Sequence, residues 1–326
     1  MRSYGLNIPS SLLYSWYRNC LSSFPKEIAD GSFHAGDIPQ KGEESLAVPI
    51  LKEENLEDDM AVDEKQVDKE MFTILSNRKT GKIALMAQTL NVKELLSLTD
   101  KFSDAKRWAV KTVTCDLSPS YHWFIRQAFM CATLIADKFH LIKHALDYLN
   151  DHRIRLKQTY LNEWRTNCEK EERKVPHLKL QNGETTLELL ARSRYLLFKR
   201  EQDWTSTQKK RAALLFKTYP ALQQDYLLVI AFRDWYDKSN IGKETSVLTK
   251  ELMEWYKKVD ANASDEIKNF KEMIEDHQAK IIPYFKDGKT NAQAENLNKR
   301  IQSFIQSNYG VRDKDFFLWR CKLYFS

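Results

Sequence analysis

Two aspartates, Asp63 and Asp116, occur where the sequence predicts strands, and their carboxylates could bind a divalent cation. Asp63 ends the run Met-Ala-Val-Asp that begins at residue 60, and Asp116 directly follows a strand-like run that ends at Cys115. Two carboxylates in one crevice cannot both stay ionised cheaply without a cation, and magnesium prefers hard oxygen ligands. The pair predicts a Mg²⁺ site if the two strands are neighbours. Two unrelated exposed aspartates are the alternative.

The residues around Asp116 indicate why it is a candidate for chemistry. Residues 108–115 alternate apolar and polar side chains and contain β-branched Val and Thr, as strands do. Ser118 and Pro119 suit the N-cap and first turn of a helix. Asp116 is therefore expected at the carboxyl end of a strand, where open α/β sheets place functional side chains.

The order of the predicted elements indicates the fold class. Strand-like runs occur at 60–63, 71–76, 82–87, 108–115 and 130–136. Helical periodicity occurs at 91–100, after Ser118 and after Asp137. This order, with one Asp on the first strand and another at the end of the fourth, is typical of a ribonuclease-H-like α/β fold, which has a mixed sheet with flanking helices.

The rest of the chain predicts a large all-helical insertion and a return to the sheet. Residues 151–285 have helical apolar periodicity throughout, so we expect one domain from 60–150 and 286–326 around that insertion. A helix after residue 290 carries Asn291, Glu295 and Asn298 on one face and an apolar stripe on the other. Glu295 thus points away from the apolar stripe.

Residues 1–59 differ from this pattern. An amphipathic helix is predicted at 10–19, with nothing before it to pack on. Residues 25–59 combine Pro and Gly with an acidic run, which is typical of a linker. The first 60 residues carry 5 basic and 10 acidic side chains, whereas 151–220 carry 16 basic and 9 acidic ones. The basic surplus favours a polyanionic partner, with a solvated helical face as the alternative.

Composition excludes several classes of protein. The longest apolar run, 226–232, is far shorter than the roughly 20 residues of a membrane helix, and the amino terminus lacks a signal-peptide core. We therefore expect a cytoplasmic protein. The five cysteines form no C-x-x-C pair, which argues against a disulfide framework or a zinc site and favours reduced, structural thiols.

Six separated segments resemble, in order, the catalytic region of bacterial insertion-sequence transposases of the DDE type, and more narrowly the ISL-three group. They read MAVDEKQ, TCDLSPSY, DKFHLIKH, ARSRYLLFKREQDWT, NAQAENLNKRI and NYGVRDKDFF. The resemblance covers residues 60–326. It implies a catalytic triad at Asp63, Asp116 and Glu295 that holds two Mg²⁺ or Mn²⁺ ions and cuts and joins DNA at element ends. Glu64 and Asp68 compete with Asp63 for the first position.

The resemblance also bears on DNA contacts and partners. The cationic and polar residues expected to contact DNA are Lys138, His140, Lys143, Arg192, Arg194, Lys199, Arg200, Asn291, Asn298 and Arg300. Trp204 is expected to stack on a splayed base, and Asp137 is either part of the site or a helix cap. The protein is expected to act in the nucleoid as a homodimer on DNA.

The chain departs from the family at its beginning. Full-length relatives carry a cysteine-rich zinc segment and a complete helix-turn-helix, whereas residues 1–24 hold one helix and a lone Cys20, as a remnant of such a module would. Recognition of element ends is therefore expected to need a separate small DNA-binding partner. The alternatives are a catalytically silent DNA-binding fragment and a host nuclease of the same fold.

Overall fold

The computed structural model describes residues 8–30, 49–307, 310–311 and 313–326. Contacts divide the chain into two compact units, a sheet unit (Met1–Asp137 with Thr290–Ser326) and a helical unit (Lys138–Lys289). None of the helices in the described ranges has the length and apolar character needed to cross a bilayer. All five cysteines are free, and Cys115 and Cys321 are buried.

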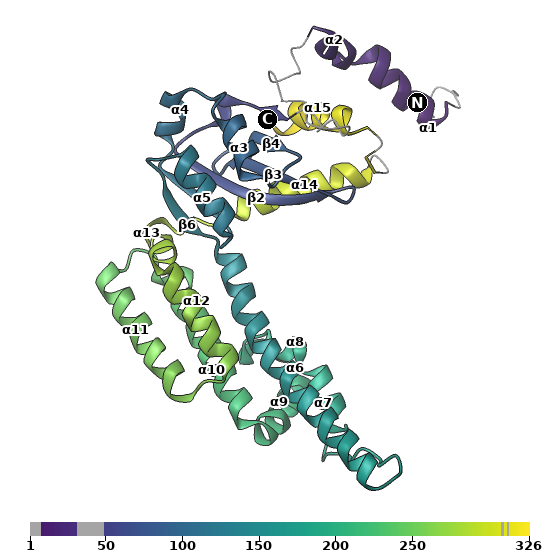
Figure 1. Ribbon diagram of the computed structural model, residues 1–326, viewed down its shortest axis with the longest axis vertical. Coiled ribbons are helices and arrows are strands. Elements are labelled where there is room, and N and C mark those ends of the chain that lie inside the picture. Colours follow the sequence, from purple (N-terminus) through teal and green to yellow (C-terminus); the bar gives the residue numbers. More distant parts are fainter. Residues whose placement is uncertain (1–7, 31–48, 308–309, 312) are drawn as a thin grey trace. The chain divides into compact units, whose positions relative to one another are not determined.

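The sheet unit contains a six-stranded mixed sheet with the order β1-β4-β3-β2-β5-β6 (Figure 1). The strands are β1 (Ile50–Leu51), β2 (Asp59–Val67), β3 (Glu70–Asn77), β4 (Ile83–Ala87), β5 (Thr112–Cys115) and β6 (Thr133–Ala136). Neighbouring strands pair antiparallel along the series β1, β4, β3 and β2. The pairs β2–β5 and β5–β6 are parallel. The predicted mixed α/β architecture is confirmed at this level.

A tight turn fixes the register of the β2–β3 hairpin. Val67 pairs with Glu70, so the loop has only two residues, Asp68 and Lys69. Both have positive φ, 48° and 71°, as a type I′ turn requires. Because side chains alternate between the faces of a strand, this register determines which face each residue of β2 occupies.

Helices cover both faces of the sheet. On one side, which we call the α5 face, α3 (Val92–Thr99) and α5 (Pro119–Ala128) bury an apolar cluster that includes Met60 and Val62. On the other, the α14 face, α14 (Ala292–Ser307) and α15 (Lys314–Phe325) cover Phe72 and Ile74. In Figure 1 the yellow helices α14 and α15 lie beside the sheet, although about 200 residues separate them from β3 in the chain.

The N-terminal helices pack on α15, contrary to the expectation that the first helix lacks a packing partner. They are α1 (Ser10–Trp16), the π-helical turn η2 (Tyr17–Leu21) and α2 (Phe24–Ala29). The Tyr14 and Phe24 rings lie 5.5 and 5.1 Å from the ring of Phe316, between centroids. Arg18 Nε also donates to Asp313 Oδ2 at 2.7 Å. Local periodicity could not identify this partner because it lies near the other end of the chain.

Three predicted boundaries differ from the structure. Trp108 lies in α4 (Asp104–Ala109) rather than in the following strand. The predicted linker 25–59 overlaps α2, β1 and the 3-10 turn η3 (Glu53–Asn55), and its residues 31–48 lie outside the described ranges. The predicted boundary at 150–151 falls inside the long helix α6, whereas the contacts divide at 137–138.

The helical unit is built around α6, which packs against α7, α8, α10 and α12. Its elements are α6 (Lys138–Lys170), α7 (Thr186–Arg192), α8 (Arg194–Leu197), η4 (Glu201–Asp203), α9 (Ser206–Thr218), α10 (Pro220–Trp235), η5 (Lys238–Asn240), α11 (Thr245–Asn262), α12 (Asp265–Ile281) and α13 (Tyr284–Asp287). Residues 171–185 are not helical and include one antiparallel bridge, Lys179–Thr185, so the prediction of helix throughout is wrong there.

A buried polar group connects three of these helices. His152 Nδ1 lies 2.5 Å from Asp225 Oδ2, and the two residues are 2% and 0% exposed. Asp225 also accepts hydrogen bonds from the backbone N–H of Ser264, at 3.0 Å, and from its hydroxyl. Asp225 therefore holds α6, α10 and the start of α12 together.

Candidate functional site

The sheet register brings Asp63, in the middle of β2, level with Asp116, which directly follows the neighbouring strand β5. The parallel pairing of β2 with β5 ends at Ala61 opposite Thr114. Each aspartate lies two residues further along its own strand direction. Since residues two apart in a strand share a face, Asp63 lies on the α14 face of the sheet, whereas Asp116 follows the last residue of β5.

Strand position also distinguishes Asp63 from Glu64 and Asp68, the two other candidates for the first carboxylate of the triad. Glu64 is paired with Thr73, whose hydroxyl lies 3.1 Å from the Tyr121 hydroxyl of α5. Glu64 thus belongs to the α5 face. Asp68 lies in the exposed β2–β3 turn. Only Asp63 of the three faces α14.

Tyr121 lies at the end of the α5 face closest to these carboxylates. Its side chain is 3% exposed, and burial raises the pKa of the phenol well above its ordinary value. The negative charges of Glu64 and Asp116 raise this pKa further. Tyr121 therefore stays protonated and can donate a hydrogen bond beside the two strand ends.

Helix α14 contacts Asp63 directly. Asn298 Nδ2 donates to Asp63 Oδ2 at 2.7 Å. Glu295 lies three residues earlier on α14, a spacing that places it on the same side of the helix as Asn298. The helix that carries Glu295 thus runs over the strand that carries Asp63.

The start of α14 is fixed to the ends of β5 and β6. The Thr114 hydroxyl donates to Asn291 Oδ1, and the Asn291 backbone N–H donates to Asp137 Oδ1 at 3.1 Å. Asp137 is 1% exposed, and its own N–H donates to the Cys115 carbonyl at 2.8 Å. These contacts set the axial position of α14, and hence the height of Glu295 and Asn298 above the sheet.

Asp116 is held by its own turn. One carboxylate oxygen accepts the Ser118 N–H at 3.0 Å, and the Asp116 carbonyl lies 3.1 Å from His122 Nε2. Both contacts come from the strand-to-helix turn that the sequence predicted. The turn leaves Asp116 half-buried rather than enclosed.

The oxygen donors at this edge fit a hard divalent cation. Asp63, Asp116 and Glu295 supply carboxylates, and Asn298 Oδ1 is buried without a hydrogen-bond partner. Within the described ranges, no three His, Cys, Asp or Glu side chains are close enough together to share a metal ion. The side chains of Asp63, Asp116 and Glu295 therefore do not form a ready-made metal-binding cluster.

A comparison with known protein families identifies the family of this chain. A family model described as a transposase, of the DDE type and the ISL-three group, matches residues 60–321. The chain belongs to this transposase family. Transposases of this kind cut and transfer DNA and generally use divalent metal ions. No curated protein matches the sequence.

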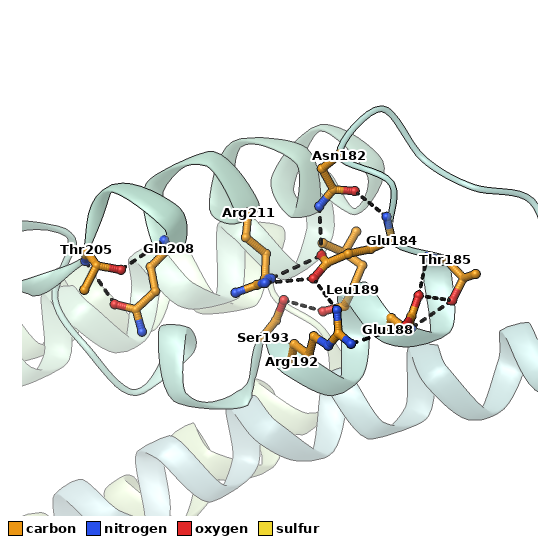
Figure 2. A network of polar contacts seen from close by, with 10 residues as sticks. All are labelled: Asn182, Glu184, Thr185, Glu188, Leu189, Arg192, Ser193, Thr205, Gln208 and Arg211. Atoms are coloured by element: carbon orange, nitrogen blue, oxygen red, sulfur yellow. Dashed lines mark hydrogen bonds and ion pairs between the residues drawn. The ribbon is translucent and has the colours of Figure 1, made fainter.

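In this transposase, two of the expected DNA-contacting arginines are engaged in ion pairs within the chain. Arg192 Nη1 lies 3.0 Å from Glu184 Oε1 and Arg192 Nη2 lies 3.3 Å from Glu188 Oε1. Figure 2 shows Arg192 and Arg211 converging on Glu184. Arg200 is paired with Asp234. These arginines stabilise the helical unit, which lessens their availability for DNA.

Other expected DNA contacts also have structural roles. Lys138 donates to the Tyr284 hydroxyl at 3.1 Å and lies over the rings of Tyr236 and Tyr284. Its pKa is lowered, mainly by burial. Asn291 is 1% exposed and binds Thr114, so its side chain faces the protein interior.

The remaining candidates are more accessible. Lys143, Arg194, Lys199 and Arg300 are exposed. The His140 ring packs edge-on against Phe139, and Arg300 lies over Phe325 in an open groove between α14 and α15. These residues stay candidates for phosphate contacts.

The expectation that Trp204 stacks on a base is wrong. Trp204 is 8% exposed, and its Nε1 donates to the Leu196 carbonyl at 2.9 Å. The exposed aromatic residue of this segment is Tyr195, at 68%. The sequence contained no signal that separates the two, because both aromatics fall in the same cationic motif.

Proposed function

We propose that this transposase catalyses metal-dependent cleavage and strand transfer at the ends of an insertion sequence. The observation that supports the proposal is the parallel pairing of β2 with β5, which ends at Ala61 and Thr114, two residues before Asp63 and Asp116, together with the contact from Asn298 on α14, the helix that bears Glu295, to Asp63. Three carboxylates from separate elements at the carboxyl edge of parallel strands are what two-metal phosphodiester chemistry needs.

The roles follow from the contacts. Asp63, Asp116 and Glu295 would hold two Mg²⁺ or Mn²⁺ ions, which when bound activate a water or 3′-hydroxyl and stabilise the leaving oxygen. Asn298 orients the Asp63 carboxylate through its amide. The Ser118 N–H orients Asp116. Outer hydrogen bonds of this kind fix a ligand's position before a metal arrives.

The fold supports the same proposal. Within the six-stranded sheet, the antiparallel strands β4, β3 and β2 followed by the parallel strands β5 and β6, with β2 in the middle of these five, fit a ribonuclease-H-like sheet, and β1 adds a further antiparallel strand at the edge. The helical unit would be an insertion between β6 and α14. We further propose that the protein acts on DNA in the cytoplasm, as a homodimer, with a separate small protein assisting recognition of the ends.

The test is cleavage of a duplex that contains the element's end, with Mg²⁺ or Mn²⁺ and with EDTA. Asp63→Asn, Asp116→Asn and Glu295→Gln should each reduce the rate beyond the roughly 10–100-fold typical of outer-shell changes. The matched control is Asp68→Asn, in the exposed turn five residues after Asp63, where Asn also tolerates positive φ. Glu64→Gln, on the opposite face, is a second control.

Three results would refute the proposal. Binding of DNA without any metal-dependent nicking would favour a catalytically silent DNA-binding fragment. Equal cleavage of duplexes with and without the element's end would favour a nuclease. Loss of cleavage in Asp68→Asn or Glu64→Gln comparable to that in Asp63→Asn would contradict the assignment of the first ligand.

A further inference from the structure

Residues 193–200 form a short segment at the surface of the helical unit. Side chains packed beneath it donate hydrogen bonds to its backbone carbonyls. α8 has only four residues, too few to be stable alone. Buried or half-buried side chains from other elements donate to the carbonyls of this segment and of Leu190 just before it. The contacts are Arg153 Nη1 to Leu190 at 2.8 Å, Trp204 Nε1 to Leu196 at 2.9 Å, Arg233 Nη1 to Phe198 at 3.1 Å and the Tyr226 hydroxyl to Lys199 at 3.0 Å.

The outward side of this segment is aromatic and cationic. Leu196 and Leu197 are buried, whereas Tyr195 is 68% exposed. The Arg194 guanidinium lies 5.7 Å from the Tyr195 ring centroid and 5.5 Å from that of Phe198. Tyr195 makes no hydrogen bond with any residue in the described ranges. Most of the ring surface is therefore open to a ligand.

The cationic residues in and beside this segment differ in whether they form ion pairs. Arg192 and Arg200, at its two ends, pair with carboxylates. Arg194 and Lys199 are exposed and form no ion pair with the part of the chain that the structure describes. The acidic Glu201 and Asp203 follow in sequence, so the cationic surface ends at Arg200.

We infer that Tyr195, Arg194 and Lys199 form a binding site for one unpaired nucleotide of DNA. The base stacks on the Tyr195 ring, and the adjoining phosphates face the two free cations. A base inside a duplex already has both faces stacked, so only an extruded or single-stranded base can use this ring. The inference rests on the proposed function, because nucleotides beside a strand break at an element end unpair and unstack more readily than those inside an intact duplex.

The restrained backbone that carries Tyr195 favours a ligand-binding role for its exposed ring. Stacking on an exposed aromatic gains most when the ring is already held in place, since less freedom is lost on binding. Trp204, Arg233 and Tyr226 donate to carbonyls within residues 193–200, and Arg153 donates to the Leu190 carbonyl in α7. These hydrogen bonds restrain the backbone that carries Tyr195 and Arg194.

The experiment measures binding of a fluorescently labelled ten-nucleotide single strand and of the matching duplex, by anisotropy, with EDTA to prevent cleavage. In the full chain, Tyr195→Ala should weaken single-strand binding by about 5- to 100-fold, from a stacking contribution of about 1–3 kcal/mol per base. Tyr195→Phe keeps the ring and should bind within about twofold of the unaltered protein. Duplex binding should change less than about twofold in both variants.

Trp108→Ala is the matched control, because Trp108 is also an exposed aromatic residue, at 52%, in the sheet unit. It should bind the single strand normally. Equal losses for single strand and duplex in Tyr195→Ala, or no loss at all, would overturn the inference. A loss in Tyr195→Phe as large as in Tyr195→Ala would indicate a hydroxyl contact and would also overturn it.

Light scattering on Tyr195→Ala tests whether this surface is instead an interface between protein molecules. A change from one oligomeric state to another would identify this surface as a protein interface and would overturn the nucleotide site. The outcome is distinguishable from failure of the proposed function. Asp116→Asn should lose cleavage yet bind the single strand as the unaltered protein does, so each result stands without the other.

Discussion

The amide of Asn298 donates to the carboxylate of Asp63 at 2.7 Å, across 235 positions of sequence. We expect Asn298→Ala to reduce metal-dependent DNA cleavage by about 10–100-fold, because an unheld carboxylate must be ordered when the metal binds. The metal concentration for half-maximal activity should rise as well. Both are measured by titrating Mn²⁺ in a cleavage assay.

The control for Asn298 is Asn296→Ala on the same helix. Asn296 is exposed and lines the groove between α14 and α15 rather than the sheet. It should cleave normally with an unchanged metal requirement. An unaltered metal titration in Asn298→Ala would show that the Asp63 contact has no positioning role.

The salt dependence of duplex binding should distinguish free cations from paired ones. Replacing both Arg194 and Lys199 by Ala should reduce the slope of log affinity against log salt by up to about 1.8, if each neutralises one phosphate. Arg192→Ala should change the slope less, since Arg192 is paired with Glu184 and Glu188. The measurement is the affinity at several salt concentrations.

An unchanged slope after the Arg194 and Lys199 replacements would assign both residues to a solvated surface. A larger change in Arg192→Ala than in the double variant would mean that DNA displaces the intramolecular ion pair. Thermal unfolding of each variant provides the control for folding.

Glu184 should give the helical unit a specific acid sensitivity. The hydrogen bond from Arg211 is the largest cause that lowers the pKa of Glu184 to about 2, against the opposing effect of burial. The pKa of a glutamate in an unfolded chain is about 4.3, which is higher than the pKa of Glu184 in the folded protein. Between about pH 4.3 and pH 2 the unfolded state therefore binds more protons than the folded state. The stability that Glu184 contributes is present above about pH 4.3 and is lost as the pH falls towards 2.

Glu184→Gln should therefore lower the free energy of unfolding at pH 7 by about 1–3 kcal/mol and reduce its loss between pH 4.3 and 2. The check is denaturant unfolding at several pH values. Glu254→Gln is the control, because its partner Lys257 and Glu254 itself are both exposed. It should leave the free energy of unfolding nearly unchanged. Equal effects of the two variants would contradict the role of the Glu184 network.

Removing the Asp225 carboxylate should lower the free energy of unfolding more than removing a surface ion pair does. Asp225→Ala leaves the buried His152 and the half-buried Ser264 N–H without their acceptor, and we expect a loss of about 3–5 kcal/mol. Asp260→Ala, which removes an exposed partner of Lys271, should cost about 1 kcal/mol or less. Urea unfolding of both variants measures the difference, and similar midpoints would contradict it.

The sequence by itself determined the local elements and the chemistry available. The β-branched runs and their turns are the observed strands β2 to β5, with Asp116 directly after β5. The spacing of Asn291, Glu295 and Asn298 placed them on one side of a helix; Glu295 and Asn298 lie in α14, and Asn291 directly precedes it. These features follow from residue periodicity and turn preferences, which act over a few residues.

The tertiary structure decided which side chains are available and which residues meet. Trp204 and Tyr195 are nine residues apart in one motif, yet packing buries the first and exposes the second. Arg192 and Arg200 look free in sequence and are paired in the fold. Asp63 was separated from Glu64 only by the register of β2, and linked to Asn298 only by the placement of α14. Such relationships depend on contacts between distant segments, which no local pattern of residues specifies.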